Sequence, residues 1–234
     1  MKEVLSYAAA AGMDFHIQEF VNYENEAGIF YYRFPSEQSG NISGIVFKEF
    51  LKVKGDGKKT VRELLRGSSR ALLQLPLLEK TEPLMLDRVI PQGELFTVSP
   101  YGNHARGALF LDHSASVSPA LIRVINEISS LMPSFYYGRF DIRYQSRELL
   151  EQGKSFSVIE VNGAGSEPTH IYDPRHSIFF AWKEIVRHWR LLCSISRANH
   201  RRGYPYLSLS EGIDMYLKDF SDAKILAAMQ KKSA

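Results

Sequence analysis

GRFDIRYQS, residues 138–146, and FSVIEVNGAGSEPTHIYDP, residues 156–174, are neighbouring stretches that combine strand-like alternation with charged side chains. In an extended strand, successive side chains point to opposite faces. Arg139, Asp141 and Arg143 therefore share one face of the first strand, and apolar residues occupy the other. We expect the two stretches to pair as adjacent strands of one sheet.

The second stretch places a carboxylate and a carboxamide on one face, because Glu160 and Asn162 are two residues apart. Glu160 lies among apolar neighbours, and a carboxylate in a buried strand is costly unless it is paired or holds a cation. If the strands pair, Asp141, Glu160 and Asn162 converge into a set of hard oxygen ligands that suits Mg²⁺. Arg139 lies on the same face and could hold a phosphate. The alternative for Asp141 alone is the solvated face of an antiparallel sheet.

The length and composition are those of an ordinary globular protein, with 234 residues of which 44% are hydrophobic and 24% charged. A chain of this length suffices for one large domain or two small ones. A net charge of +3 does not argue for a nucleic-acid partner. The single cysteine, Cys193, excludes an internal disulfide framework and fits a reducing compartment, so we expect a cytoplasmic protein. No run of 18 apolar residues is present, so the sequence predicts no membrane span.

The order of the expected elements is mixed, which favours an α+β architecture over a doubly wound parallel sheet. Thr60 and Glu63 have the spacing of a capping box. The expected elements are a helix at 2–12, a strand at 15–21, a hairpin of strands at 27–35 and 41–53, a strand, loop and strand over 94–114, a helix at 117–132, the strand pair above, and a helix at 177–200. The last helix carries an apolar stripe at helical spacing, made of Ile178, Trp182, Ile185, Trp189 and Leu192.

The pattern R-x-D, then E-x-N, then a glycine loop resembles the second half of an ATP-grasp ligase of the D-alanine–D-alanine ligase-like branch. The resemblance implies an ATP-grasp fold in which Asp141, Glu160 and Asn162 bind two Mg²⁺ ions on the ATP phosphates. It implies that Arg139 stabilises the transferring phosphate and the acyl-phosphate intermediate. Gly165 corresponds to a glycine that lends a backbone donor to the tetrahedral intermediate.

A second match concerns QEFVNYENE, residues 18–26, which resembles the hinge strand that grips adenosine in this family. The resemblance places Glu19 and the backbone of Phe20 and Val21 at the adenine, and Glu26 at the ribose hydroxyls. Two exposed acids are the alternative when the spacing is considered alone.

Two further positions complete the nucleotide site that the resemblance implies. Lys48 matches a lysine that contacts an ATP phosphate, and a solvated strand lysine is its alternative. Ile159 corresponds to the apolar floor beneath adenine. Seven histidines invite a zinc interpretation, but no HxxxH pair or cysteine cluster has metal-ligand spacing, so we do not expect zinc. For His170, in EPTHIYDP, a structural turn is favoured over contact with substrate.

The resemblance implies three parts: a partial small subdomain with the hinge strand at 1–66, a large subdomain with the metal hairpin at 67–176, and a C-terminal helical segment at 177–234. ATP would lie between two antiparallel sheets, and the activity would be ATP- and Mg²⁺-dependent ligation of a small carboxylate to an amine. The family's front domain, its first phosphate-binding lysine and its glycine-rich closing loop are not found. The alternative is therefore a non-catalytic or partner-dependent nucleotide-binding module, whose open sheet edge a partner chain or a second copy would cover.

Overall fold

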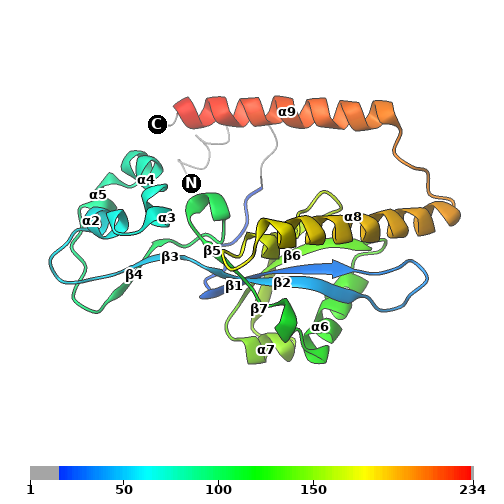
Figure 1. Ribbon diagram of the computed structural model, residues 1–234, viewed down its shortest axis with the longest axis horizontal. Helices are drawn as coiled ribbons and strands as arrows, with labels where there is room; N and C mark the ends of the chain where they lie inside the picture. The colour runs from blue at the N-terminus through cyan, green and yellow to red at the C-terminus, as the bar shows by residue number, and fades with distance from the viewer. Residues whose placement is uncertain (1–15, 233–234) are drawn as a thin grey trace. The chain divides into compact units, whose positions relative to one another are not determined.

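The computed structural model describes residues 16–232, with side chains as far as Lys224, and divides the chain into two compact units (Figure 1). The larger unit is Val21–Gly203. The smaller combines Met1–Phe20 with Tyr204–Ala234, and its described secondary structure is the helix α9, Leu209–Lys232. The expected helix at 2–12 lies outside the described residues.

A five-stranded antiparallel sheet forms the centre of the larger unit, in the order β5-β2-β1-β6-β7. Its strands are β1 (Asn25–Tyr32), β2 (Asn41–Glu49), β5 (Leu109–Asp112), β6 (Tyr137–Tyr144) and β7 (Phe156–Asn162). The expected hairpin is confirmed as β1 and β2, and the strand pair of the opening stretches as β6 and β7. An α+β fold with antiparallel sheets is thus confirmed. The sheet joins strands from both sides of residue 66, where we expected a subdomain boundary.

A second, two-stranded sheet pairs β3 (Leu51–Lys54) with β4 (Leu95–Ser99). The expected single strand at 41–53 is therefore wrong, because the chain leaves the large sheet after Glu49 and enters the small one. Four short helices pack on the small sheet around a separate apolar core. They are α2 (Val61–Arg66), α3 (Ser69–Leu72), α4 (Leu75–Thr81) and α5 (Pro83–Leu86).

The capping box expected at the start of α2 is confirmed. The Thr60 side chain accepts from the Glu63 backbone N–H, and the Glu63 carboxylate accepts from the Thr60 backbone N–H at 2.8 Å. These two bonds satisfy donors that a helix start leaves without intrahelical partners.

Helices cover both faces of the large sheet (Figure 1). α6 (Pro119–Ser130) packs on the face that carries the apolar side chains of β1, β2 and β6, and α7 (Arg147–Glu151) lies beside it. The opposite face receives α8 (Ile178–Arg201), whose Ile195 packs against Phe30 and Tyr137. The short 3-10 helices η1 (His104–Arg106), η2 (Ser114–Ser116) and η3 (Thr169–Tyr172) lie in the connections.

The apolar stripe expected on α8 is only partly buried. Trp182 and Trp189, on the predicted apolar stripe, are 57% and 68% exposed. The buried positions of this helix are Glu184, His188 and Ile195. A stripe at helical spacing identifies an apolar face of a helix but does not show what that helix packs against. Here Glu184 and His188 can be buried because they form hydrogen bonds with polar groups beneath the helix.

The expected strand at 15–21 is also wrong over its described part. Residues 16–21 have no regular secondary structure, and β1 begins at Asn25. Alternation alone does not make a strand, because the backbone groups need a partner strand to bond with. None of the helices between residues 16 and 232 combines the length and the apolar character that a membrane span requires.

The core beneath α6 generates a stability prediction. Phe140 is fully buried in it, whereas its cross-strand neighbour Val161 is 44% exposed. We expect Phe140→Ala to lower the free energy of unfolding by about 3–5 kcal/mol, because it leaves a cavity in a packed core. Val161→Ala is the control and should change the free energy by about 0.5 kcal/mol or less. Urea denaturation measures both, and equal losses would contradict this account of the core.

Candidate functional site

The face of the large sheet opposite α6 carries a cluster of charged side chains from four strands. Strand register explains how they meet. Glu26 on β1 lies opposite Lys48 on β2 and, on its other side, opposite Arg143 on β6. Asp141, two residues before Arg143, lies opposite Glu160 on β7. Residues far apart in the sequence thereby become neighbours on one surface.

Asp141 is the centre of the cluster. Its carboxylate accepts from Arg139 Nε at 2.9 Å and from Arg139 Nη2 at 3.1 Å, a bidentate pair. Lys48 Nζ lies 3.4 Å from Asp141 Oδ1 and donates to Glu26 Oε1 at 2.9 Å. The side chains of Lys48, Glu26 and Asp141 are each only 4% exposed. Such buried charges are tolerated because each has an opposite charge within reach.

Arg143 forms the edge of the cluster beside Glu26. Its Nε lies 3.3 Å from Glu26 Oε2, and its Nη1 donates to the backbone carbonyl of Val21 at 2.9 Å. Nη2 donates to the carbonyl of Pro100, in the segment that follows β4. This arginine therefore ties the sheet to two connecting segments.

Gly28 makes room for the ion pair on the neighbouring strand. A Cβ at this position would lie 3.2 Å from Asp141 Oδ1, 3.4 Å from Arg139 Cδ and 3.0 Å from a Val46 methyl group. The distances to Val46 and to Asp141 Oδ1 are tighter than ordinary van der Waals contact. Because Gly28 has no side chain, the Arg139 and Asp141 side chains can occupy the space beside β1.

Glu160 and Asn162 extend the cluster onto the edge strand β7. Burial and the charge of Asp141 raise the pKa of the Glu160 carboxyl, although Arg139 and Lys48 pull it down. The Asn162 carboxamide can donate to Glu160 Oε1 and accept from Arg139 Nη2, both at 3.1 Å. Asp141, Glu160 and Asn162 thus lie together on adjacent antiparallel strands, as predicted.

A bulge in β7 separates the polar and apolar parts of this strand. Asp141 pairs with Glu160 but Ile142 pairs with Val158, so Ile159 is the extra residue. The bulge changes the parity of the strand, and Val158 consequently packs into the apolar core beneath α6. Without it, Val158 would share the charged face with Glu160, which is two residues away.

Two expectations about burial need correction. Glu160 is an exposed residue, because β7 is the edge of the sheet, although its carboxyl is partly withdrawn from water beside Asp141. Lys48 is buried between two carboxylates, so the alternative of a solvated strand lysine is wrong. Arg143 and Gly28 had no assigned role in the sequence. The shared parity of Arg143 with Asp141 was an available signal, whereas the need for Gly28 follows only from the pairing of β1 with β6.

Other residues predicted to belong to the site have fewer contacts with the charged cluster or none. Gly165 lies in the loop after β7, and a Cβ there would meet no heavy atom of the described chain within 4 Å. Val21 contacts the cluster through its carbonyl oxygen, which accepts from Arg143 Nη1. Glu19 and Phe20 belong to the smaller unit, whereas the cluster lies in the larger one.

Comparisons with known proteins give a distant likeness to solved structures and no match by sequence. No protein-family model matches the chain, and no curated protein matches it. Among solved structures it is similar to a bifunctional glutathione synthetase from Pasteurella multocida, with 15% identity and a TM-score of 0.43. The match covers 74% of this chain and 24% of that one, so the chain spans about a quarter of that protein's length. A likeness of this strength carries no argument about activity.

The cluster generates a prediction about protonation. In Asp141→Asn, we expect the pKa of the Glu160 carboxyl to fall, because the like charge that raises it is gone and Arg139 and Lys48 remain. Carboxyl-detected NMR titration of Glu160 measures this shift. Glu127→Gln, an exposed change on α6, is the control and should leave the Glu160 titration in place. A Glu160 pKa that stays the same or rises in Asp141→Asn would show that the two carboxyls do not interact.

Proposed function

We propose that this chain carries the phosphate- and metal-binding half of an ATP-grasp ligase site. The observation that carries the proposal is the meeting of Arg139, Asp141, Glu160 and Asn162 on one face, with Lys48 beside them. The motif order resembles this family, and the geometry satisfies the requirement that the motif residues be neighbours.

The residues present fit a magnesium ion. Asp141, Glu160 and Asn162 supply two carboxylates and a carboxamide, which are oxygen ligands of the kind that Mg²⁺ prefers. Burial and the neighbouring Asp141 charge raise the pKa of Glu160, which means that its ionised form lacks full compensation and would gain from an added cation. These three side chains would hold the ion, which would neutralise charge on the ATP phosphates.

Arg139 and Lys48 are proposed to bind the transferring phosphate. Arg139 is fixed by its bidentate pair with Asp141 and by a 3.4 Å bond from Nη1 to the Glu167 carbonyl. Lys48 is held on the same surface by Glu26 and Asp141. Positioned cations of this kind stabilise phosphoryl transfer because they need little reorganisation during the reaction. The loop with Gly165 has open space beside it, which suits approach by a substrate oxygen to its backbone N–H.

The adenosine end of the site is proposed from the resemblance: Glu19, Phe20 and Val21 for adenine, Ile159 for the apolar floor, and Glu26 for the ribose. For Glu26 the ribose role competes with a structural one, because its two carboxylate oxygens already contact Lys48 and Arg143. The reaction would be attack of a small carboxylate on the γ-phosphate, followed by displacement of phosphate from the acyl phosphate by an amine.

A second candidate is a non-catalytic or partner-dependent nucleotide-binding module. The observation that favours it is that the Lys48 ammonium already contacts two buried carboxylates, those of Glu26 and Asp141. To reach a phosphate, Lys48 would have to give up one of these contacts. Such a module would bind nucleotide and Mg²⁺ without forming product.

The test is nucleotide binding with and without Mg²⁺. We expect Glu160→Gln to weaken Mg²⁺-dependent ATP binding about tenfold to a hundredfold, because the carboxamide keeps the shape but loses the charge that holds the cation. Glu127→Gln, an exposed acid on α6, is the matched control. Isothermal titration calorimetry measures both. Equal affinity in the wild type and Glu160→Gln would remove Glu160 from the metal site.

Product formation separates the two candidates. Purified chain is incubated with ATP, Mg²⁺ and a panel of small carboxylates and amines, and ADP release is measured. Substrate-dependent release that Arg139→Lys reduces would support the ligase. Binding without substrate-dependent release would support the module.

A further inference from the structure

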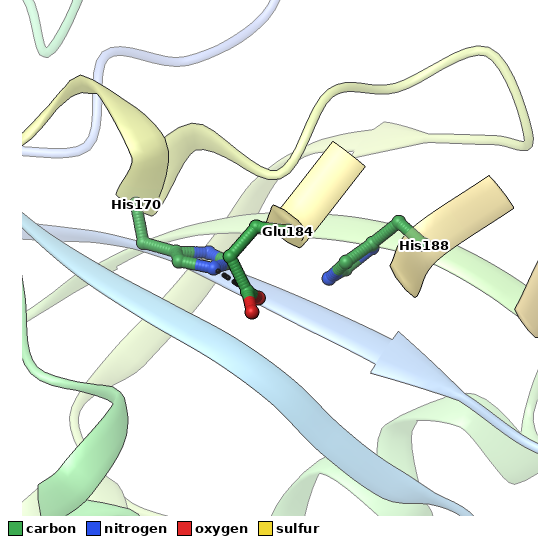
Figure 2. Close-up of side chains that lie close together, drawn as sticks. All are labelled: His170, Glu184 and His188. Atoms are coloured by element: carbon green, nitrogen blue, oxygen red, sulfur yellow. Dashed lines mark hydrogen bonds and ion pairs between the residues drawn. The ribbon is translucent and has the colours of Figure 1, made fainter. Parts of the chain in front are cut away.

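A second polar cluster lies between η3 and α8, where His170, Glu184 and His188 converge (Figure 2). Each can offer one ligand atom, and these atoms all lie within 4.8 Å of one another. All three residues are buried, His188 to 1% exposure. Glu184 and His188 are four residues apart on α8, so they share a face of the helix. The proposed ATP site uses none of these side chains.

Hydrogen bonding defines the tautomer of His188. Its Nε2 lies 3.2 Å from Arg187 Nη2, which can only donate, so Nε2 must carry a lone pair. Nδ1 then carries the proton and donates to the Tyr137 hydroxyl oxygen at 3.1 Å. Burial raises the pKa of Tyr137 to about 12, and burial and Arg187 lower the pKa of His188 to about 4. A neutral imidazole with one nitrogen fixed by a partner and the other presenting a lone pair is the usual state of a metal-binding histidine.

Glu184 and His170 complete the set. Glu184 Oε2 lies 3.0 Å from His170 Nε2 and accepts from Arg187 Nε at 2.9 Å and Nη2 at 2.5 Å. Hydrogen bonds from Arg187 and His170 hold the pKa of Glu184 below its usual value despite burial, so it is ionised at neutral pH. A Cβ at position 44 would collide with the His170 ring, so Gly44 on β2 is what allows this histidine to lie against the sheet.

The Arg187 guanidinium lies among the hydrogen-bond acceptors of this cluster, and more acceptors contact its Nη2 atom than that atom has hydrogens. Nη2 has two hydrogens, whereas three acceptors contact it: Glu184 Oε2, the Ser43 carbonyl at 2.7 Å, and His188 Nε2. The arginine side chain is 41% exposed, in contrast to the three residues it covers. It reaches in from the surface and can leave by rotation about its own side-chain bonds.

We propose that His170, Glu184 and His188 form a zinc-binding site in which the Arg187 guanidinium takes the place of the metal. Two imidazoles and one carboxylate are a ligand set that zinc accepts, with a fourth position for water. Zinc–ligand distances of about 2.0–2.1 Å in a tetrahedral site separate neighbouring ligand atoms by about 3.3 Å. The His170–Glu184 separation of 3.0 Å is already close to that value. On zinc binding the ring proton of His170 would lie on Nδ1 in place of Nε2, so that Nε2 presents its lone pair to the metal.

The site would hold η3 against α8. η3 follows the loop that contains Gly165, and the Glu167 carbonyl in that loop accepts from Arg139 of the charged cluster. Zinc would therefore anchor the far end of a loop whose near end borders the proposed phosphate site. The sequence contains no HxxxH pair, and the pair Glu184 and His188 becomes a candidate only because the fold brings His170 to it.

The experiment is zinc titration of the untagged full chain after treatment with a chelator, followed by calorimetry. Cobalt(II) absorption reports tetrahedral coordination independently. We expect one site in the wild type, and about a tenfold to hundredfold weaker affinity or more in His188→Gln and His170→Gln. Cys193→Ser is the control on the same helix, because it removes the chain's only thiol and leaves the proposed ligands intact; its affinity should match the wild type.

Two variants keep all three ligands and so test the proposal even if the histidine variants fold poorly. Arg187→Gln removes the competing cation, and we expect it to bind zinc about tenfold more tightly or better. Tyr137→Phe removes the partner of His188 Nδ1, and we expect affinity to fall about tenfold to a hundredfold. Zinc should also raise the Tm of the wild type and Arg187→Gln.

Three results would overturn the proposal. The first is no saturable zinc binding by either the wild type or Arg187→Gln, which would show that the cluster is a closed network with arginine as its permanent cation. The second is equal affinity in the wild type and folded His188→Gln. The third is loss of binding in Cys193→Ser, which would assign the metal to the thiol.

Discussion

The ion pair between Asp141 and its two cations is the interaction on which the charged face of the sheet depends. Lys48 reaches Asp141 from β2, across β1, and Arg139 lies two residues before Asp141 on β6; both contact the same carboxylate. Removing one member of such a buried group typically costs about 3–5 kcal/mol, because the remaining charge has no water to solvate it. The cluster therefore requires the strand order β2-β1-β6 and the register that aligns Glu26 with both Lys48 and Arg143.

The large sheet separates apolar and polar chemistry between its two faces. Phe140 and Ile142 pack beneath α6, while the residues that alternate with them carry charge. Two local irregularities make this separation possible. Gly28 provides the space that the Arg139–Asp141 pair occupies, and the bulge at Ile159 lets β7 place Glu160 on the charged face and Val158 in the core.

Two polar clusters share the face of the sheet that α8 covers in part. One surrounds Asp141, and the other contains His170, Glu184 and His188. The segment from Asn162 to Tyr172 runs between them: it begins on β7, passes the Arg139 contact at Glu167, and ends in η3. One short segment thereby contributes to the surroundings of both clusters.

The sequence by itself determined the α+β class, the hairpins, the capping box at Thr60 and the convergence of Asp141, Glu160 and Asn162. Most of these features depend on period-two alternation and on local spacing, which are properties of a few consecutive residues, and the convergence follows once the two alternating stretches pair. The tertiary structure alone decided which face of α8 is buried, that Lys48 lies between two carboxylates, and that β2 and β3 belong to different sheets. It also decided that Glu160 lies at a sheet edge and that His170 meets α8. Each of these outcomes depends on partners at least 14 residues away, because burial and pairing are set by what packs against a residue and not by its neighbours in the chain.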